Sequence, residues 1–461
     1  LHDALPISRM KTEYRILSTT AILGYGFPMT SFERGLAEKP DLIAADAGST
    51  DPGPWYLGSG TSFTDRAAVK RDLAIMLRAG LELKIPIVVG TAGGSGADVH
   101  LQWCLDIARE ICREDGLHPR VGVIHAEYEP AAVVAAHERG DLVPLGPAPE
   151  ADRDTILASS HIVGQMGVEP FIYALDQGVD FVLAGRAYDP SVFAADPIRK
   201  GCDPGLALHL GKILECAAIC ADPGSGSDCM MGYLGEDYFR LKALSPERRC
   251  TEYSVAAHTL YEKSDPYHLP GPGGSLDLTD CTFEQQADGS VKVTGSRFIP
   301  ADEYTIKLEG ARLAGFRTVS IAGTRDPIMI REIDGTLEAV RARIADNFGG
   351  SLDYKLNFII YGRDGVMGSL EPHPDTSGAH ELGIIIEAVA PTQEDADTVC
   401  SFARSTMLHY GYPGRVATAG NLAFPFSPSD LHAGEVYEFS LYHLLRTPDP
   451  LANFAYEEVN F

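Results

Sequence analysis

The segment DAGSTDPGP (46–54) carries Asp46, Ser49, Thr50 and Asp51 in one predicted turn. Two carboxylates held in one crevice push their pKa values apart, so they can work as acid and base, and they can also ligate a divalent metal. Asp46 and Asp51 are therefore candidate metal ligands, and Asp51 is also a candidate catalytic group. Ser49 and Thr50 are candidate substrate-binding residues. The same composition suits an ordinary Asx turn, and both interpretations stay open.

The segment IVVGTAGGSGADVH (87–100) runs from a β-type strand through small residues into an amphipathic helix. Small residues let the backbone approach a ligand, and the N–H groups that open a helix suit an anion such as a carboxylate. The candidate substrate-binding residues of this turn are Gly93, Gly94, Ser95 and Gly96. Asp98 and His100 are candidate proton-transfer groups. Alternatively, the glycines only allow a sharp, closely packed turn, with Asp98 as a helix cap.

Several familiar motifs do not occur in the chain. The Gly-rich turns do not have the third glycine of G-x-G-x-x-G, and Gly96-Ala97-Asp98 has an acid where a Walker A loop has lysine. A dinucleotide site and an ATP phosphate clamp are therefore disfavoured, and no cofactor is evident. There is no H-E-x-x-H, H-x-H or G-x-S-x-G pattern. Candidate general bases among the histidines are His100, His125, His161 and His258.

Arg186 and Asp189 lie together in AGRAYDP (184–190), after an apolar strand. A guanidinium there can bind a substrate carboxylate through two parallel hydrogen bonds, and it can equally form a structural ion pair with Asp189. Arg186 and Asp189 are both candidate substrate-binding residues. In the second half, Arg297 and the nearby Lys307 could complete an anion site across a domain cleft. A solvated strand face is the more usual place for such a lysine.

The elements that must position these residues alternate between short apolar strands and amphipathic helices from Arg15 onward. This alternation predicts an α/β fold with a doubly wound, mostly parallel sheet in the first half. In such sheets the ligand crevice lies at the carboxyl ends of the strands. The polar turns at 46–51, 90–100, 125–129 and 185–189 should therefore converge on one pocket.

The periodicity changes near residues 223–235, which predicts a linker and then a smaller α+β domain. We expect an α/β domain over 14–230 and a second domain over 231–461. Residues 1–13 are interpreted as a non-native or disordered leader, because LHDALPISR (1–9) has neither a basic nor an apolar region of a signal peptide.

The composition restricts the class of partner. The 461 residues carry a formal net charge of −26 and nine cysteines without a C-x-x-C pair. Such an acidic chain disfavours nucleic acid and anionic membranes, and no apolar run approaches the ~20 residues of a membrane helix. We expect a cytoplasmic protein with free thiols that forms a homo-oligomer and binds a small anionic substrate.

Several long segments resemble the AtuA family, the acyclic terpene utilisation proteins, over residues 14 to 445. The resemblance rests on ILGYGFP, DLIAADAGSTDPGPWYLGSG, VVGTAGGSGADVHL, VAAHTLYEKSDPY, KLEGA, GTRDP, NLAFPFSPSD and GEVYEFSLYH. It implies a bacterial catabolic protein of citronellol and geraniol degradation that occurs with acyl-CoA enzymes. It also implies a small companion domain, which we expect as a separate subunit.

Two functions remain open at this stage. The first is a lyase, hydratase or isomerase acting on a small carboxylate or an acyl-CoA, with CoA as part of the substrate and a divalent metal as an open option. Asp51, Asp98 or His100 would exchange the proton. The second is a non-catalytic subunit that binds a metabolite or docks to an acyl-CoA carboxylase or transferase.

Overall fold

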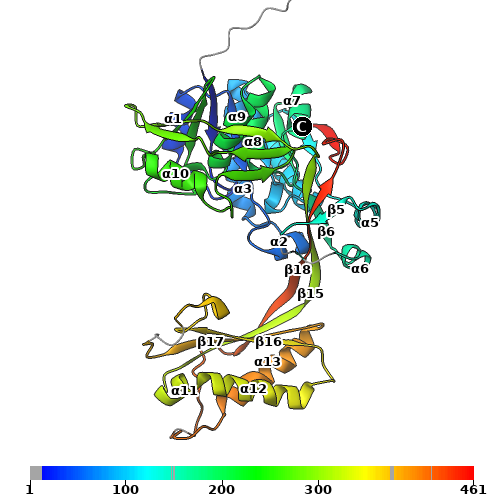
Figure 1. Cartoon of the computed structure of the whole chain (residues 1–461), viewed down its shortest axis with the longest axis vertical. Coiled ribbons are helices and arrows are strands. Elements are labelled where there is room, and N and C mark those ends of the chain that lie inside the picture. Colours follow the sequence, from blue (N-terminus) through cyan, green and yellow to red (C-terminus); the bar gives the residue numbers. More distant parts are fainter. Residues whose placement is uncertain (1–12, 147, 149–150, 374–377, 417) are drawn as a thin grey trace, which may run out of the picture. The chain divides into compact units, whose positions relative to one another are not determined.

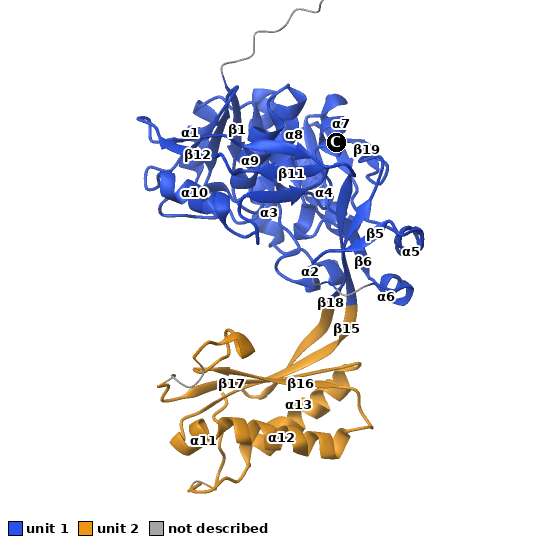
Figure 2. Ribbon diagram, in the orientation of Figure 1, with its two compact units in different colours: residues 1–312, 439–461 blue, residues 313–438 orange. Residues whose placement is uncertain are grey.

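The computed structural model describes residues 13–146, 148, 151–373, 378–416 and 418–461, and these form two compact units (Figure 2). Unit 1 contains the described residues up to 312 together with 439–461, and unit 2 contains those of 313–438. The predicted boundary at residue 230 lies inside unit 1. Apart from residue 13, the predicted leader lies outside the described residues.

Five parallel strands form the centre of unit 1. Each is joined to the next by at least one helix, so the chain returns in the same direction. In their order across the sheet they are β1 (Tyr14–Ser18), β2 (Leu42–Asp46), β3 (Ile87–Gly90), β7 (Phe181–Ala184) and β4 (Arg120–Ile124). Their carboxyl ends lie at one edge, where the polar turns of the sequence follow.

Helices cover both faces of this parallel core. Successive strand residues enter different hydrophobic clusters: Leu42 and Ala44 belong to one, Ile43 and Ala45 to the other. This period of two explains why the strands are apolar throughout. One cluster includes residues of α1 (Met29–Ala37), α3 (Arg66–Leu83) and α4 (Asp98–Asp115). The other includes residues of α5 (Pro130–Arg139), α6 (Arg153–Leu157), α7 (Glu169–Asp176), α8 (Asp189–Arg199), α9 (Pro204–Leu214) and α10 (Glu252–Leu260).

The full sheet has ten strands and is mixed. Beyond β1 it continues antiparallel through β8 (Met230–Leu234), β9 (Phe239–Ala243), β13 (Val291–Thr294) and β12 (Thr282–Gln285). At its other edge β19 (Tyr456–Asn460) pairs antiparallel with β4. The α/β class is therefore confirmed, but a mostly parallel sheet is not.

Shorter elements complete unit 1. A three-stranded antiparallel sheet contains β10 (His268–Gly271), β11 (Gly274–Asp277) and β14 (Arg297–Pro300). The remaining elements are α2 (Pro54–Ser59), β5 (Leu142–Pro144), β6 (His161–Gly164) and the 3-10 turns Ala92–Gly94 and Ala217–Cys220.

Unit 2 has the β-α-β-β-α-β order of ferredoxin-like folds. Its strands lie in the order β16 (Lys355–Tyr361), β17 (Leu382–Ala390), β15 (Thr305–Thr324) and β18 (Asp430–Arg446). Apolar side chains of α12 (Ile333–Phe348) and α13 (Gln393–Leu408) pack on the sheet, beside α11 (Pro327–Arg331). A 3-10 turn covers Gly368–Leu370. β15 and β18 lie side by side and contribute residues to both units (Figure 1).

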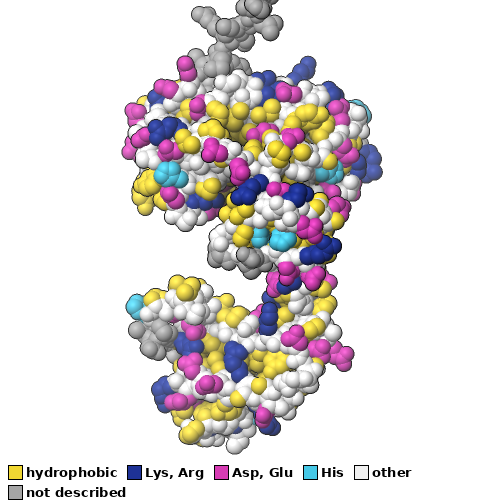
Figure 3. Space-filling model, turned by 45° about the vertical axis from the view of Figure 1, so that its right-hand side comes forward, with side chains coloured by type: hydrophobic (Ala, Val, Ile, Leu, Met, Phe, Trp, Pro, Cys, Tyr) yellow, Lys and Arg dark blue, Asp and Glu magenta, His cyan; other side chains and the backbone are white. Residues whose placement is uncertain are grey.

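The charges on the surface are mixed, and the cysteines are unpaired as the sequence predicts. Acidic side chains are interspersed with Lys and Arg over the face shown in Figure 3, rather than segregated from them. All nine cysteines are free. Among the helices of the described residues, none has the length and apolar character to cross a membrane.

Candidate functional site

A buried arginine lies at the centre of the candidate site. Arg186 follows the end of β7 by two residues, and only 2% of it is exposed. Its Nε lies 2.7 Å from Oε2 of Glu309, and its Nη1 lies 3.0 Å from Oδ1 of Asp189. Burial of a guanidinium is tolerable only because both carboxylates pair with it.

Glu309, on β15, joins this arginine to a lysine and a threonine. Its Oε1 accepts hydrogen bonds from Lys307 Nζ at 2.7 Å and from Thr50 Oγ1 at 2.9 Å. Burial alone would raise the pKa of Glu309, but Arg186 and Lys307 outweigh burial and lower it to about 2. Glu309 is therefore ionised. We call Thr50, Arg186, Asp189, Lys307 and Glu309 the Arg186 network.

Two other carboxyls, Asp189 of the network and Asp46 beside it, have raised rather than lowered pKa values. Asp46 ends β2 and is buried, and burial together with the nearby Asp189 raises its pKa well above the usual range, despite Arg186. Burial also raises the pKa of Asp189, although Arg186 opposes it. Oδ2 of Asp46 accepts a hydrogen bond from Gly48 N at 3.1 Å. Buried carboxyls with raised pKa values are what proton transfer near neutral pH requires.

The Asp46→Asn variant should gain stability relative to the wild type as the pH rises from about 5 to about 9. A carboxyl whose pKa is raised on folding stabilises the fold while it is protonated, and this contribution is lost as the pH passes through the folded pKa. Asparagine resembles the protonated form at every pH. Urea unfolding at several pH values measures the difference, and a difference that does not change with pH would contradict the raised pKa of Asp46.

The Gly-rich turn brings two strand ends together by close backbone packing. A Cβ added to Gly96 would lie 2.2 Å from the backbone N of Arg186, and one added to Gly48 would lie 2.9 Å from Cα of Gly94. The glycines of this turn are buried. These contacts agree with the interpretation that the glycines allow a sharp, closely packed turn. The binding of a substrate carboxylate by this turn stays a prediction.

The Gly96→Ala variant should be about 1–3 kcal/mol less stable than Gly116→Ala. Both glycines have positive φ, +71° and +65°, so both substitutions strain the backbone. Only at Gly96 does the new methyl group meet other atoms, because nothing lies within 4 Å of a Cβ at Gly116. Thermal or urea unfolding of the two variants measures the difference, and equal losses would show that the close approach to Arg186 is relaxed at no cost.

Asp98 and His100 contact residues outside the Arg186 network. Oδ1 of Asp98 lies 2.8 Å from Nδ1 of His125, and its backbone N donates to Glu127 at 2.7 Å. Glu127 also lies 2.6 Å from Nδ1 of His161. None of these contacts among the described residues includes a member of the Arg186 network.

His100 supports a loop. Its Nε2 lies 3.1 Å from the carbonyl oxygens of both Tyr56 and Thr61, and because both are acceptors, Nε2 carries the proton. Burial lowers the pKa of His100, which keeps the ring neutral. The catalytic roles predicted for Asp98 and His100 stay predictions.

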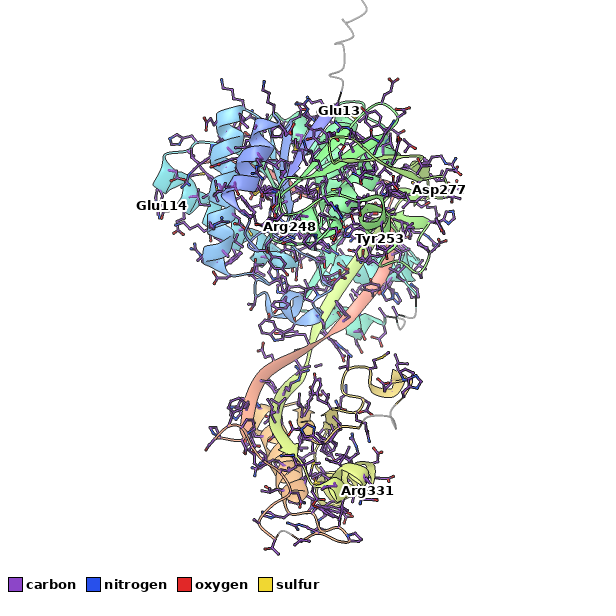
Figure 4. The ribbon with its side chains drawn as sticks, turned by 90° about the vertical axis from the view of Figure 1, so that its left-hand side faces the viewer. Glu13, Glu114, Arg248, Tyr253, Asp277 and Arg331 are labelled. Atoms are coloured by element: carbon purple, nitrogen blue, oxygen red, sulfur yellow. The ribbon has the colours of Figure 1, made fainter. Side chains whose placement is uncertain are left out.

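Arg297 is half-exposed on the three-stranded sheet. Its guanidinium pairs with Asp277 at 2.8 Å and Asp280 at 2.9 Å. Asp277 lies at the periphery of unit 1 (Figure 4). The structure thus brings Asp46, Thr50, Arg186 and Asp189 together, and it engages Arg297 with acids of its own sheet.

A cavity of about 470 Å³ adjoins the Arg186 network within unit 1. Thr50 and Tyr442 connect the cavity to the network. Thr50 belongs to the network and also lines the cavity. Tyr442 lines the cavity, and its OH lies 3.4 Å from Lys307 Nζ. The volume is typical of small-molecule sites. The lining residues are Thr50, Asp51, Leu145, Ala148, Phe439, Ser440, Leu441, Tyr442 and His443.

The turn that follows β2 lines this cavity. Ser49 Oγ accepts a hydrogen bond from the backbone N of Asp51 at 3.2 Å, so this serine shapes the turn. Asp51 is exposed and close enough to Asp189 to contribute to its raised pKa. Within the residues that the structure describes, no group of three or more His, Cys, Asp or Glu is arranged to hold a metal ion. A metal at Asp46 and Asp51 stays a prediction.

Glu309 is fully buried at the centre of the network and was not among the residues that the sequence motifs indicated. The signal was present as a glutamate within the apolar and small residues of TIKLEGA (305–311). The alternating pattern correctly predicts a strand there, but an alternating strand normally exposes such a residue.

Comparison with known families gives a match over most of the chain. The model of a family described as "Acyclic terpene utilisation family protein AtuA" matches residues 66–225 and 242–426. No curated protein and no solved structure matches the chain.

Proposed function

Because the chain belongs to the acyclic terpene utilisation family AtuA, which supports a role in acyclic terpene catabolism, we propose that it is a catabolic enzyme acting by proton transfer. We assign it the reaction of a lyase, hydratase or isomerase on a branched acyclic acid or its CoA thioester. The observation that carries this proposal is the Arg186 network with its two raised-pKa carboxyls, adjoining a cavity at the carboxyl ends of the parallel strands.

Three residues of the network have different roles in the proposed reaction. Asp189 takes a proton from a carbon next to the substrate carbonyl, and the electron pair of that C–H bond moves onto the carbonyl oxygen. Lys307 stabilises the resulting negative charge, because an ammonium has three donors and Glu309 and Tyr442 account for two of them. Arg186 is engaged by Glu309 and Asp189, so it holds Asp189 in position.

The cavity suits the hydrocarbon part of such a substrate. Leu145, Ala148, Phe439 and Leu441 present apolar surface, and the polar residues Thr50 and Tyr442 lie on the side of the network. Apolar walls with a few polar groups at one end are the usual form of a site that orients a small molecule.

Hydrogen exchange into substrate tests the proposed function. The protein is incubated in D₂O with branched acyclic acids and their CoA thioesters, and mass spectrometry records deuterium in the recovered compounds. We expect deuterium next to the carbonyl of at least one compound with the wild type. Absence of exchange in every compound, with co-purification of an acyl-CoA carboxylase or transferase from the native host, would favour an accessory subunit instead.

A further inference from the structure

Three polar atoms beside the Arg186 network are buried without any hydrogen-bond partner among the described residues. They are Oδ1 of Asp46, Oγ of Ser191 and Oε2 of Glu215. Ser191 is fully buried, and only 5% of Asp46 is exposed. Leaving a buried polar group unpaired is unfavourable, so three such atoms in one region indicate a place where a bound molecule supplies the missing partners.

The fold brings the elements that carry these atoms together. A Cβ added to Gly211 of α9 would lie 2.5 Å from the carbonyl oxygen of Pro190, so α9 packs directly on the first turn of α8. One helical turn later, Leu214 O accepts a hydrogen bond from Ser18 Oγ at 2.6 Å, at the carboxyl end of β1. Glu215, the next residue, therefore lies near the carboxyl ends of β1 and β2. It is close to the first turn of α8, which holds Asp189 and Ser191.

The cations of this region are already paired. Arg186 contacts Glu309 and Asp189, Lys307 contacts Glu309, and the buried Lys212 lies 3.3 Å from Glu262. Asp46 and Glu215 remain as further carboxyls, so five carboxyls surround three cations. A free carboxylate bound here would have to share its cation with an acid, and it would lie among carboxyls, which is unfavourable in a buried site.

Burial, together with Asp189, raises the pKa of Glu215 well above the usual range, as burial does for Asp46. A protonated carboxyl both donates and accepts hydrogen bonds, as a serine hydroxyl does. The complementary ligand is a neutral oxygen that accepts such bonds.

We propose that Asp46, Ser191 and Glu215 bind the reacting end of the substrate as a neutral oxygen, a thioester carbonyl or a hydroxyl, and that the site rejects a free carboxylate. This inference rests on the proposed function and narrows its substrate class from free carboxylates and thioesters to compounds whose reacting end is neutral. A free carboxylate, which the sequence led us to expect as the bound group, is then not the group that these three residues bind.

Ligands of one carbon skeleton and different head groups test the inference. Calorimetry compares citronellate with its S-methyl thioester and with citronellol. We expect at least one neutral compound to bind about tenfold or more tightly than citronellate. Equal or tighter binding of citronellate, or no binding of either neutral compound, would overturn the inference.

The Ser191→Ala variant links the binding to the unpaired atoms. Because the hydroxyl has no partner in the unliganded protein, its removal should leave the melting temperature unchanged or raise it. The affinity for the neutral ligand should fall about 5- to 10-fold, as expected for one lost hydrogen bond. Ser31→Ala is the matched control, a buried serine on α1 that should leave the affinity unchanged.

The result separates the two proposals. An unchanged affinity of Ser191→Ala for the neutral compounds would overturn the inference, while deuterium exchange by the wild type would still support the enzyme. Selective binding that Ser191→Ala weakens, without any exchange, would support the neutral-oxygen site and contradict the proposed catalysis.

Discussion

The Asp189→Asn variant should lose about 10²- to 10⁴-fold in turnover and in deuterium exchange. It should remain folded, because Glu309 still pairs with the buried Arg186 guanidinium. Asparagine has nearly the shape of aspartate and can still accept the hydrogen bond from Arg186 Nη1, which lies 3.0 Å from Oδ1 in the wild type. It cannot carry the proton that leaves the substrate. Initial rates with the compound that the wild type deuterates measure the loss.

Asp203→Asn is the matched control for this variant. Asp203 caps α9 by accepting a hydrogen bond from Leu206 N at 2.9 Å, and asparagine caps helices equally well. Its turnover should remain within about twofold of the wild type. If Asp189→Asn behaved like this control, Asp189 would not be the proton-transfer group.

The Arg186→Met variant should lose about 3–5 kcal/mol of stability. The substitution removes the cation that pairs with the buried Glu309 and the partly buried Asp189, and it leaves both carboxyls close to Asp46 without that cation. Ionised carboxyls buried together repel each other and have lost their hydration. Urea unfolding near neutral pH measures the loss.

Arg120→Met provides the comparison for an exposed ion pair. Arg120 lies 3.0 Å from Glu458 with both side chains partly exposed, so its loss should cost much less stability than the loss of Arg186. The double variant Arg186→Met with Glu309→Met should recover part of the loss, because the carboxylate left unpaired is then also removed. A loss at Arg186 no greater than at Arg120 would contradict the structural role of the network.

Local patterns determine the part of the fold that the sequence predicts. Apolar strands such as IPIVVG (85–90) and the helices between them indicate the parallel core, because each element and its turn are adjacent in the chain. The antiparallel extension is different. β8 lies in the stretch interpreted as a linker, yet it pairs with β1 over two hundred residues earlier. Pairing at that separation leaves no periodicity that a single sequence reveals.

In the candidate site, too, the sequence predicts only the part that depends on local patterns. Asp46, Thr50, Arg186 and Asp189 follow strands of the parallel core, and the rule that ligands bind at carboxyl ends of strands places them together. Lys307 and Glu309 come from β15, more than one hundred residues after Arg186, and only tertiary structure brings them to it. Gly96 packs against the backbone of Arg186 and Gly94 against Phe63, and the predicted substrate-binding role of both glycines stays a prediction.

Carbon-13 NMR of the side-chain carboxyls of Asp and Glu tests most directly whether this site holds an exchangeable proton at neutral pH. Signals are assigned with Asp46→Asn, Asp189→Asn and Glu309→Gln. We expect the Asp46 carboxyl to remain protonated well above the pH at which ordinary aspartates ionise, and Glu309 to remain ionised down to about pH 2. Ionisation of Asp46 and Asp189 together with the exposed aspartates would contradict the account.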